Sequence, residues 1–251
     1  MINDQMYYIR GEPTSHQEAK TFIEWYRRSI RRSFDRHMAT LKHIPKHSYV
    51  LDYGCGWGIL SEMISEERAC RVDAIDPEAN SIRIARDFIG ERDGLSYSTT
   101  DICEISDEIY DVVVSSEVVE HTLNPGMYLK ECNRVLKPGG FLIISLPNIM
   151  TPRYILSMVL SNQQRRFKSI SRSMKTSYEK TQHHVQAWDP STFCRLVCIL
   201  GFEYVNHEFV EGWALPKNRY WRHPWGALKN LSYKMIFKLR KNQHVYVQPY
   251  E

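Results

Sequence analysis

The chain has 251 residues, of which 43% are hydrophobic and 25% charged, and its formal net charge at pH 7 is +4. This composition is typical of a globular protein and excludes an intrinsically disordered chain, a collagen and a small disulfide-built scaffold. No apolar run approaches the roughly 18 residues of a membrane span, and the N-terminal segment lacks the apolar core of a secretory signal. The six cysteines include no C-x-x-C pair. We therefore expect a cytoplasmic protein.

Predicted strands and helices alternate along most of the chain. A long basic amphipathic helix is expected over residues 16–43, ahead of the first strand. The expected strands are 50–53, 72–75, one ahead of residue 100, 111–115, 141–146, 202–207 and 245–247. The expected helices cover 57–67 and run from Asp76-Pro77 to Gly90, from Asn124-Pro125 to Pro138, and from Asp189-Pro190 to Gly201. Apolar strands that alternate with helices predict an α/β fold, with a parallel sheet covered by helices on both faces.

Two segments interrupt this alternation and carry an excess of basic residues. Residues 151–182 have seven Lys or Arg against one acidic residue, and residues 211–242 have eight against one. Both follow strands, and ligands of open α/β sheets bind beyond the carboxyl ends of the strands. We therefore expect the two insertions to cap the site. The expected organisation is one domain, with an N-terminal helical lid (1–45), a cofactor-binding core (46–150), the two cap insertions, and the rest of the sheet (183–210 and 243–251).

A glycine-rich turn follows the first predicted strand, in the sequence Asp52-Tyr53-Gly54-Cys55-Gly56-Trp57-Gly58. The dinucleotide-binding fingerprint needs its third glycine where this chain has Ile59, so that fingerprint is excluded. The spacing is G-x-G-x-G, with an acidic residue two positions before the first glycine. This motif resembles the first motif of the class I S-adenosylmethionine-dependent methyltransferases. In such a turn, glycine lets the backbone approach a ligand closely.

Further motifs of that family follow in order. Asp76 stands 18 residues after Gly58, where a carboxylate accepts the hydrogen bonds of a ribose diol; capping a helix is its alternative role. The resemblance spans residues 45–148, including Arg134–Phe141 at a helix-to-strand junction, and continues more weakly to Phe202. It implies a Rossmann-like, doubly wound, seven-stranded and mostly parallel sheet that binds S-adenosylmethionine. The cofactor-binding residues that it implies are Asp52, Gly54, Cys55, Gly56, Gly58, Asp76, Pro77, Asp101, Ile102, Ser116 and Glu117.

The family's catalytic face begins after the fourth strand, in Ser115-Ser116-Glu117-Val118-Val119-Glu120-His121. Methyl transfer to a hydroxyl needs a base, and an imidazole with a free pKa near 6.5 suits that task. We assign His121 and Glu120 to catalysis, with a structural histidine bonded to the next turn as the alternative. The pattern most resembles ubiquinone-biosynthesis O-methyltransferases and their relatives that act on glycans, lipids and secondary metabolites.

Four residues leave a metal site open. Glu117, Glu120, His121 and His184 also match the metal ligands of small-RNA 3′-terminal 2′-O-methyltransferases. Two carboxylates and two imidazoles suit a divalent cation. The same residues occur in relatives for which no metal role follows, so we do not expect a metal.

The acceptor is the open question. The second basic segment interleaves aromatic residues, which is typical of single-stranded nucleic-acid grooves, of interfacial membrane helices and of pockets for phosphorylated sugars. The aromatic residues can also simply pack the segment onto the sheet. We expect O-methylation of a small anionic, glycan or lipid-linked acceptor, with peripheral membrane contact left open, no DNA partner and no RNA partner. The alternatives are a metal-assisted RNA 2′-O-methyltransferase and a non-catalytic cofactor-binding subunit.

Overall fold

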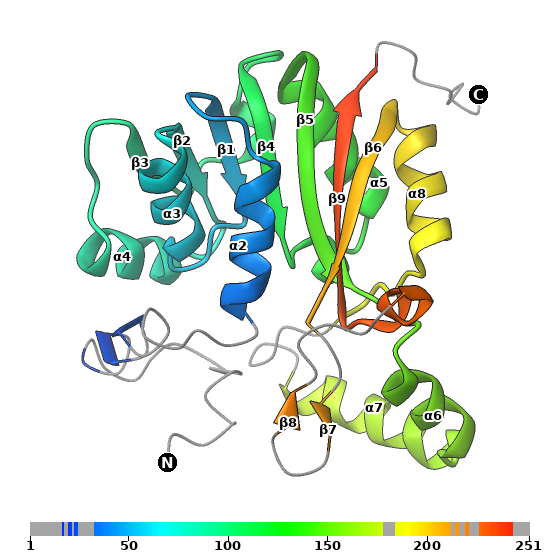
Figure 1. The fold of residues 1–251 in the computed structure, drawn as a ribbon. Helices are drawn as coiled ribbons and strands as arrows, with labels where there is room; N and C mark the ends of the chain where they lie inside the picture. The colour runs from blue at the N-terminus through cyan, green and yellow to red at the C-terminus, as the bar shows by residue number, and fades with distance from the viewer. Residues whose placement is uncertain are drawn as a thin grey trace, which may run out of the picture.

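The computed structural model describes residues 33–177, 184–211 and 226–242, with a few further positions between 17 and 24, at 214–215 and at 219–220. Its main sheet has the strand order β3-β2-β1-β4-β5-β9-β6 (Figure 1). β9 pairs antiparallel with β5 and β6, and the other four pairings are parallel, so the seven-stranded, mostly parallel and Rossmann-like sheet is confirmed. The strands are β1 (Tyr49–Tyr53), β2 (Arg71–Ile75), β3 (Leu95–Ser98), β4 (Tyr110–Ser116), β5 (Leu136–Pro147), β6 (Phe202–Val210) and β9 (Lys234–Lys241).

Helices cover both faces of this sheet, as expected. On one face lie α2 (Ser33–His43), α3 (Ile59–Arg68) and α4 (Ala79–Phe88), packed in one core cluster with Val50 and Val112. On the other lie α5 (Pro125–Val135) and α8 (Pro190–Ile199), packed with Leu51 and Val113. Because successive strand residues point to opposite faces, a strand covered on both sides has apolar residues at every position. This explains the continuous apolar runs of the sequence.

Short polar signals determine where two of these helices begin. The side chain of Asn124 accepts a hydrogen bond from the Met127 N–H at 3.0 Å and caps α5. The Asp189 carboxylate caps α8 through the N–H groups of Ser191 and Thr192, at 2.9 and 3.2 Å. Both caps precede a proline at the first turn, where its missing N–H costs no hydrogen bond. The expected start of α4 at Asp76-Pro77 is wrong by two residues, because the helix begins after Glu78.

Part of the segment expected as the second basic insertion, residues 211–242, belongs to the main sheet. Lys234–Lys241 forms β9 and pairs with β5 on one side and β6 on the other. The expectation that all of residues 211–242 lie outside the sheet is therefore wrong. Met235, Ile236, Phe237 and Leu239 are buried, which is the pattern of a central strand. Its four basic residues hide that pattern in the sequence. The strand expected at 245–247 lies outside the described residues.

The first basic insertion forms two helices, α6 (Pro152–Leu160) and α7 (Gln163–Ser177). Figure 1 shows them beyond the end of β5, at the edge of the sheet where the parallel strands finish. A small two-stranded ribbon, β7 (Ala214–Leu215) and β8 (Arg219–Tyr220), and the short helix η5 (Gly226–Leu231) complete the described elements after β6. Of the long helix expected over 16–43, the described part is α2 and a few helical positions before it. Among the described residues, no helix is long and apolar enough to cross a membrane.

Candidate functional site

The glycine turn joins the end of β1 to α3 and lies beside the end of β2. The N–H groups of Gly54 and Cys55 both donate to the Ile75 carbonyl, at 2.8 and 3.0 Å. Gly54, Gly56 and Gly58 all have positive φ, at 82°, 53° and 77°. Glycine adopts this conformation without the steric cost that a side chain brings. The turn is thereby held against the neighbouring strand.

The three glycines differ in what surrounds them. A Cβ at Gly54 would lie 2.4 Å from a Val118 methyl group, and one at Gly58 would lie 2.6 Å from the Tyr97 ring. A Cβ at Gly56 would meet no described atom within 4 Å. Close approach to a ligand therefore explains glycine only at Gly56. The packing of the protein itself explains it at the other two.

The carboxylate of Asp52 lies under the turn rather than on its surface. The residue is 1% exposed, and its Oδ2 accepts a hydrogen bond from the Ser61 hydroxyl at 2.5 Å. Burial raises the pKa of Asp52 to about 7, Asp76 adds to this rise, and the Ser61 hydrogen bond opposes it. In this geometry Asp52 supports the turn from below and fixes the start of α3.

Asp76 ends β2 and faces the turn. Its Oδ2 accepts the Gly56 N–H and its Oδ1 accepts the Glu78 N–H, both at 2.9 Å. An ionised carboxylate has about four lone-pair positions, so these two bonds leave capacity for the two hydroxyls of a diol. Burial raises the pKa of Asp76, and the two backbone hydrogen bonds lower it. Asp76 thus bridges β2 and the turn, whereas its alternative role as the cap of α4 is not seen, because that helix begins after Glu78. Pro77 beside Asp76 is exposed.

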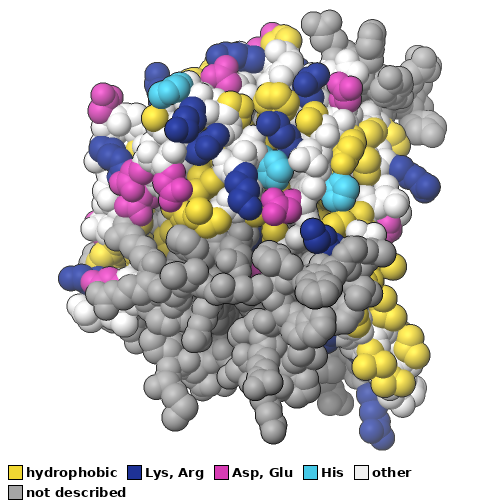
Figure 2. Space-filling view, viewed as in Figure 1, with side chains coloured by type: hydrophobic (Ala, Val, Ile, Leu, Met, Phe, Trp, Pro, Cys, Tyr) yellow, Lys and Arg dark blue, Asp and Glu magenta, His cyan; other side chains and the backbone are white. Residues whose placement is uncertain are grey.

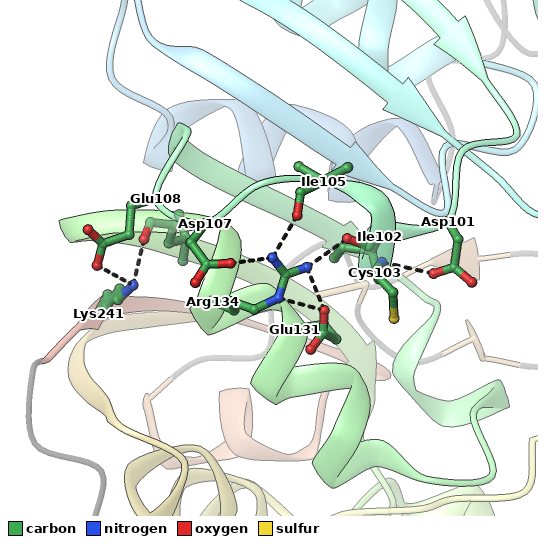
Figure 3. Close-up of polar contacts among 10 residues, drawn as sticks. Asp101, Ile102, Cys103, Ile105, Asp107, Glu108, Glu131, Arg134 and Lys241 are labelled. Atoms are coloured by element: carbon green, nitrogen blue, oxygen red, sulfur yellow. Dashed lines mark hydrogen bonds and ion pairs between the residues drawn. The ribbon is translucent and has the colours of Figure 1, made fainter.

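The loop after β3 carries Asp101 and Ile102 and is tied to α5 by one arginine (Figure 3). Asp101 is exposed and caps a short 3-10 helix, η2 (Ile102–Glu104), through the Cys103 N–H at 2.9 Å. The Arg134 guanidinium donates to the carbonyls of Ile102 and Ile105, at 2.8 and 2.6 Å. It also contacts carboxylates on either side of it, at Asp107 and Glu131. A planar guanidinium with five donors can satisfy this many acceptors, which lysine cannot.

Ser116 and Glu117 lie at the end of β4, opposite β5. Ser116 contacts the Ser145 hydroxyl at 3.1 Å, and the same hydroxyl donates to Glu117 Oε1 at 3.2 Å. Glu117 adopts a left-handed conformation, with φ at +60°. Its Oε2 is paired with Lys234 at the start of β9 and lies 3.6 Å from Arg36 of α2. Burial and Arg36 lower the pKa of Lys234 to about 7, whereas the carboxylate against it acts in the opposite direction.

Glu120, His121 and His184 meet just beyond this point. Glu120 and His121 belong to the 3-10 helix η3 (Val119–His121), and the Glu120 carbonyl accepts the N–H groups of Val185 and Gln186, which brings His184 alongside. One ligand atom from each of the three side chains lies within 4.8 Å of the others. Glu120 is 1% exposed, and neither of its carboxylate oxygens has a hydrogen-bond partner among the described residues. Burial raises the pKa of Glu120 to about 7.

The four residues that match the metal ligands of the RNA enzymes do not come together. Glu120, His121 and His184 form a group, but Glu117 is held by Lys234, Arg36 and Ser145 instead. The donor set of this chain therefore does not fit the four-ligand site.

Three contributors to this site were missed by sequence reasoning. Arg36 and Lys234 reach Glu117 from a helix before β1 and from the strand mistaken for an insertion. Ser145 reaches it from β5. No motif marks these residues, and only the pairing of β5 with β9 brings Lys234 beside the end of β4.

Comparison with known proteins gives concordant results. A family model described as a methyltransferase domain matches residues 22–207. The ubiquinone biosynthesis O-methyltransferase of Rattus norvegicus, a mitochondrial protein, is 40% identical over 123 residues, which are 45% of this chain and 35% of that protein. The Bradyrhizobium diazoefficiens enzyme of the same name is 34% identical over 130 residues, 51% of each chain. The matches thus span about a third to a half of the length of these curated relatives.

Solved structures share the fold at low sequence identity. An S-adenosylmethionine-dependent methyltransferase from Mesorhizobium loti has a TM-score of 0.57 at 16% identity, over 81% of this chain and 96% of that one. The [4+2]-cyclase SpnF has the same TM-score at 15% identity, over 83% and 80%. A cyclase on the same fold shows that fold does not fix the reaction. The resemblance inferred from the motifs is confirmed by the family match over most of the chain, and this protein is a member of the methyltransferase-domain family, with similarity to the ubiquinone biosynthesis O-methyltransferases.

Proposed function

We propose that this protein is an S-adenosylmethionine-dependent O-methyltransferase acting on a small anionic or lipid-linked acceptor. The observation that carries the proposal is the position of Glu120 and His121. They lie at the end of β4, the strand next to β1, so they share an edge of the sheet with the glycine turn. This arrangement supports a cofactor position beside a candidate base.

The cofactor side would use residues that the turn presents. Gly56 leaves open space, Asp76 has hydrogen-bonding capacity for two ribose hydroxyls, and Asp101 with Ile102 borders the adjacent loop. Gly54, Cys55 and Gly58 shape the turn, and Asp52 supports it from beneath. S-adenosylmethionine supplies a methyl group on a sulfonium, and its thioether leaves without charge. The protein therefore needs orientation more than charge stabilisation.

The acceptor side would use His121 and Glu120. A hydroxyl acceptor becomes a better nucleophile when a base removes its proton as the new bond forms. The His121 imidazole is partly exposed and lies edge-on to His184, with ring centroids 4.8 Å apart. The Glu120 carboxylate, without a described donor, can accept a hydrogen bond from an incoming hydroxyl or orient the imidazole.

The surface of α6 and α7 supports a lipid-linked acceptor. Large apolar side chains are exposed along both helices, at Leu156, Val159, Leu160, Phe167 and Ile170. Figure 2 shows apolar side chains gathered at the lower right, where these helices lie in Figure 1, with basic side chains beside them. Exposed apolar side chains with basic neighbours are typical of surfaces that rest on anionic lipid. These helices would then form the part of the cap that meets the membrane.

The two alternatives make different demands. A metal-assisted RNA 2′-O-methyltransferase needs the four-ligand set, from which Glu117 is separated. A non-catalytic cofactor-binding subunit needs no base, so Glu120 and His121 would be dispensable to it.

The test is transfer of an isotopically labelled methyl group. The purified protein is incubated with deuterated-methyl cofactor and lipid or aqueous extracts of the native cells, and products are detected by mass spectrometry. The proposal predicts a labelled methyl ether in the wild-type reaction and at least a hundredfold less product with His121→Ala, in line with the usual contribution of a general base. Labelling of RNA alone would favour the first alternative, and cofactor binding without any labelled product would favour the second.

A further inference from the structure

Glu117 is committed to two cations that come from distant parts of the chain. Lys234 opens β9 and Arg36 lies in α2, and both reach the same carboxylate oxygen. The side chains of Arg36, Glu117 and Lys234 are only 14%, 14% and 19% exposed, so water screens this cluster weakly. Ser145 donates to the other carboxylate oxygen.

The backbone also holds Glu117 in this position. Glu117 has φ at +60°, which is unfavourable for a residue with a side chain. Its N–H donates to the Ser145 carbonyl at 3.0 Å, so the strained residue is fixed to β5 at the same place as its side chain. Rotation of the carboxylate toward Glu120 would strand a buried ammonium and a buried guanidinium without their partner, and an uncompensated buried charge is strongly destabilising.

Next to the ion pairs of Glu117 lies a group of side chains that could bind a metal ion. Glu120, His121 and His184 are close enough to share a ligand, and Glu120 lacks a described hydrogen-bond donor. A fourth ligand from Glu117 would complete two carboxylates and two imidazoles, a set suited to Mn²⁺ or Mg²⁺. In this chain the Glu117 carboxylate is instead paired with two positively charged side chains, those of Lys234 and Arg36.

We propose that Lys234, assisted by Arg36, takes the place of a divalent cation at Glu117 and keeps this carboxylate out of the Glu120, His121 and His184 group. Lys234 is thus a positioning residue that makes this member of the family independent of a metal held through Glu117. The inference concerns ion binding and does not depend on which acceptor is methylated.

The experiment measures Mn²⁺ binding at pH 7 by calorimetry on the full chain. In Lys234→Met the ammonium is lost and Glu117 becomes available, so Mn²⁺ should bind at least tenfold more tightly than to the wild type. Arg36→Met combined with Lys234→Met should strengthen binding further. Adding Glu117→Gln to Lys234→Met should return the affinity to the wild-type value.

Two controls separate this effect from general changes of charge. Lys234→Arg keeps the cation and should behave as the wild type. Lys238→Met removes a lysine from the same strand, one that donates to the His43 carbonyl rather than to Glu117, and should also leave Mn²⁺ binding unchanged. Unchanged Mn²⁺ affinity in folded Lys234→Met would overturn the proposal.

A second measurement remains decisive if Lys234→Met does not fold. In the wild-type background, Glu117→Gln should leave the affinity for Mn²⁺ within twofold, because Glu117 is not a ligand there. A loss of tenfold or more would show that Glu117 binds the ion in the native protein and would overturn the proposal.

Discussion

The three glycines of the turn between β1 and α3 illustrate how one motif combines two physical requirements. Gly54 and Gly58 need their missing Cβ for contacts with Val118 and Tyr97 inside the protein. Gly56 has open space where its Cβ would be. Substitution at these positions should therefore separate folding from binding.

Replacing Gly54 should mainly destabilise the fold, and replacing Gly56 should mainly weaken the binding of the cofactor. Gly54→Ala adds a 2.4 Å contact to a positive φ, and overpacking with backbone strain should cost about 3 kcal/mol. Gly56→Ala has only the strain, about 1 kcal/mol, but its methyl group enters the space of the ligand. Urea unfolding and calorimetry with S-adenosylhomocysteine measure the two effects. Equal loss of stability in both variants with equal cofactor affinity would contradict this division.

Asp52 should make stability depend on pH. Burial raises its pKa from 3.8 to about 7, so the folded protein keeps a proton that the unfolded chain releases near pH 4. The free energy of unfolding should therefore fall as pH rises from 4 to 7, by at most about 4 kcal/mol, and become constant above that range. Asp52→Asn keeps the shape without the titration. The difference between the two urea-unfolding series should follow this curve, and a difference that rises with pH would contradict it.

At this scale the sequence was informative where contacts are local. Asp76 stands 18 residues after Gly58 at the end of the next predicted strand, and adjacent parallel strands bring their ends together. The order of the strands and the resemblance to the family therefore predicted that Asp76 and the glycine turn would meet. The ion pairs of Glu117 with Arg36 and Lys234 depend on the docking of α2 and on the place of β9. Neither has a sequence signal of its own.

At the scale of elements, the caps were predictable and the last strand was not. Asn124-Pro125 and Asp189-Pro190 are local signals, and both helices begin there. In β9, lysines and an arginine flank and interrupt a run of buried apolar residues, and the long stems of these basic side chains can lie along the sheet. Lys238, for example, lies 4.3 Å from the ring centroid of Phe141. The high content of basic residues therefore made this strand look like part of an insertion.

Arg134 should control the loop that borders the cofactor. Loss of its hydrogen bonds to the Ile102 and Ile105 carbonyls frees the segment that carries Asp101. Arg134→Leu should raise the Kd for S-adenosylhomocysteine about fivefold to tenfold, equivalent to about 1–1.4 kcal/mol. Lys137→Leu is the matched control, since its partner Asp111 lies at the opposite edge of the sheet. Equal affinities of the two variants would show that the loop keeps its position without Arg134.

At the scale of the whole molecule, α6 and α7 carry many of the exposed apolar side chains among the described residues, together with exposed basic ones. Val159 and Leu160 are each 73% exposed, and Arg165 and Lys168 are exposed on the adjacent helix. Because β9 runs antiparallel to β5, Lys238 and Arg240 lie opposite Ile143 and Phe141, and Lys241 lies opposite Phe202 of β6. These three basic residues are therefore away from the edge of the sheet that carries the site. Any electrostatic attraction of an acceptor must therefore depend on fewer basic residues than the sequence suggested.

This surface should bind anionic lipid vesicles. The wild type should sediment together with vesicles that contain phosphatidylserine, and the bound fraction should fall as the salt concentration rises. Val159→Asp with Leu160→Asp should abolish binding, and Arg165→Glu with Lys168→Glu should weaken it severalfold. Ile199→Asp, at an exposed position of α8, should have no effect. Binding that survives the α6 substitutions would exclude this surface as the site of contact.

The central claim is that the edge formed by the glycine turn and Asp76 binds S-adenosylmethionine. Calorimetric titration of S-adenosylhomocysteine into the wild type and Asp76→Ala tests it most directly. Loss of the carboxylate leaves the ribose hydroxyls without their acceptor, which should cost about 1.5–3 kcal/mol, a weakening of roughly ten- to a hundredfold. Asp87→Ala, on α4, is a control that should bind as the wild type does. Unchanged affinity in Asp76→Ala, or no binding to the wild type, would contradict the account.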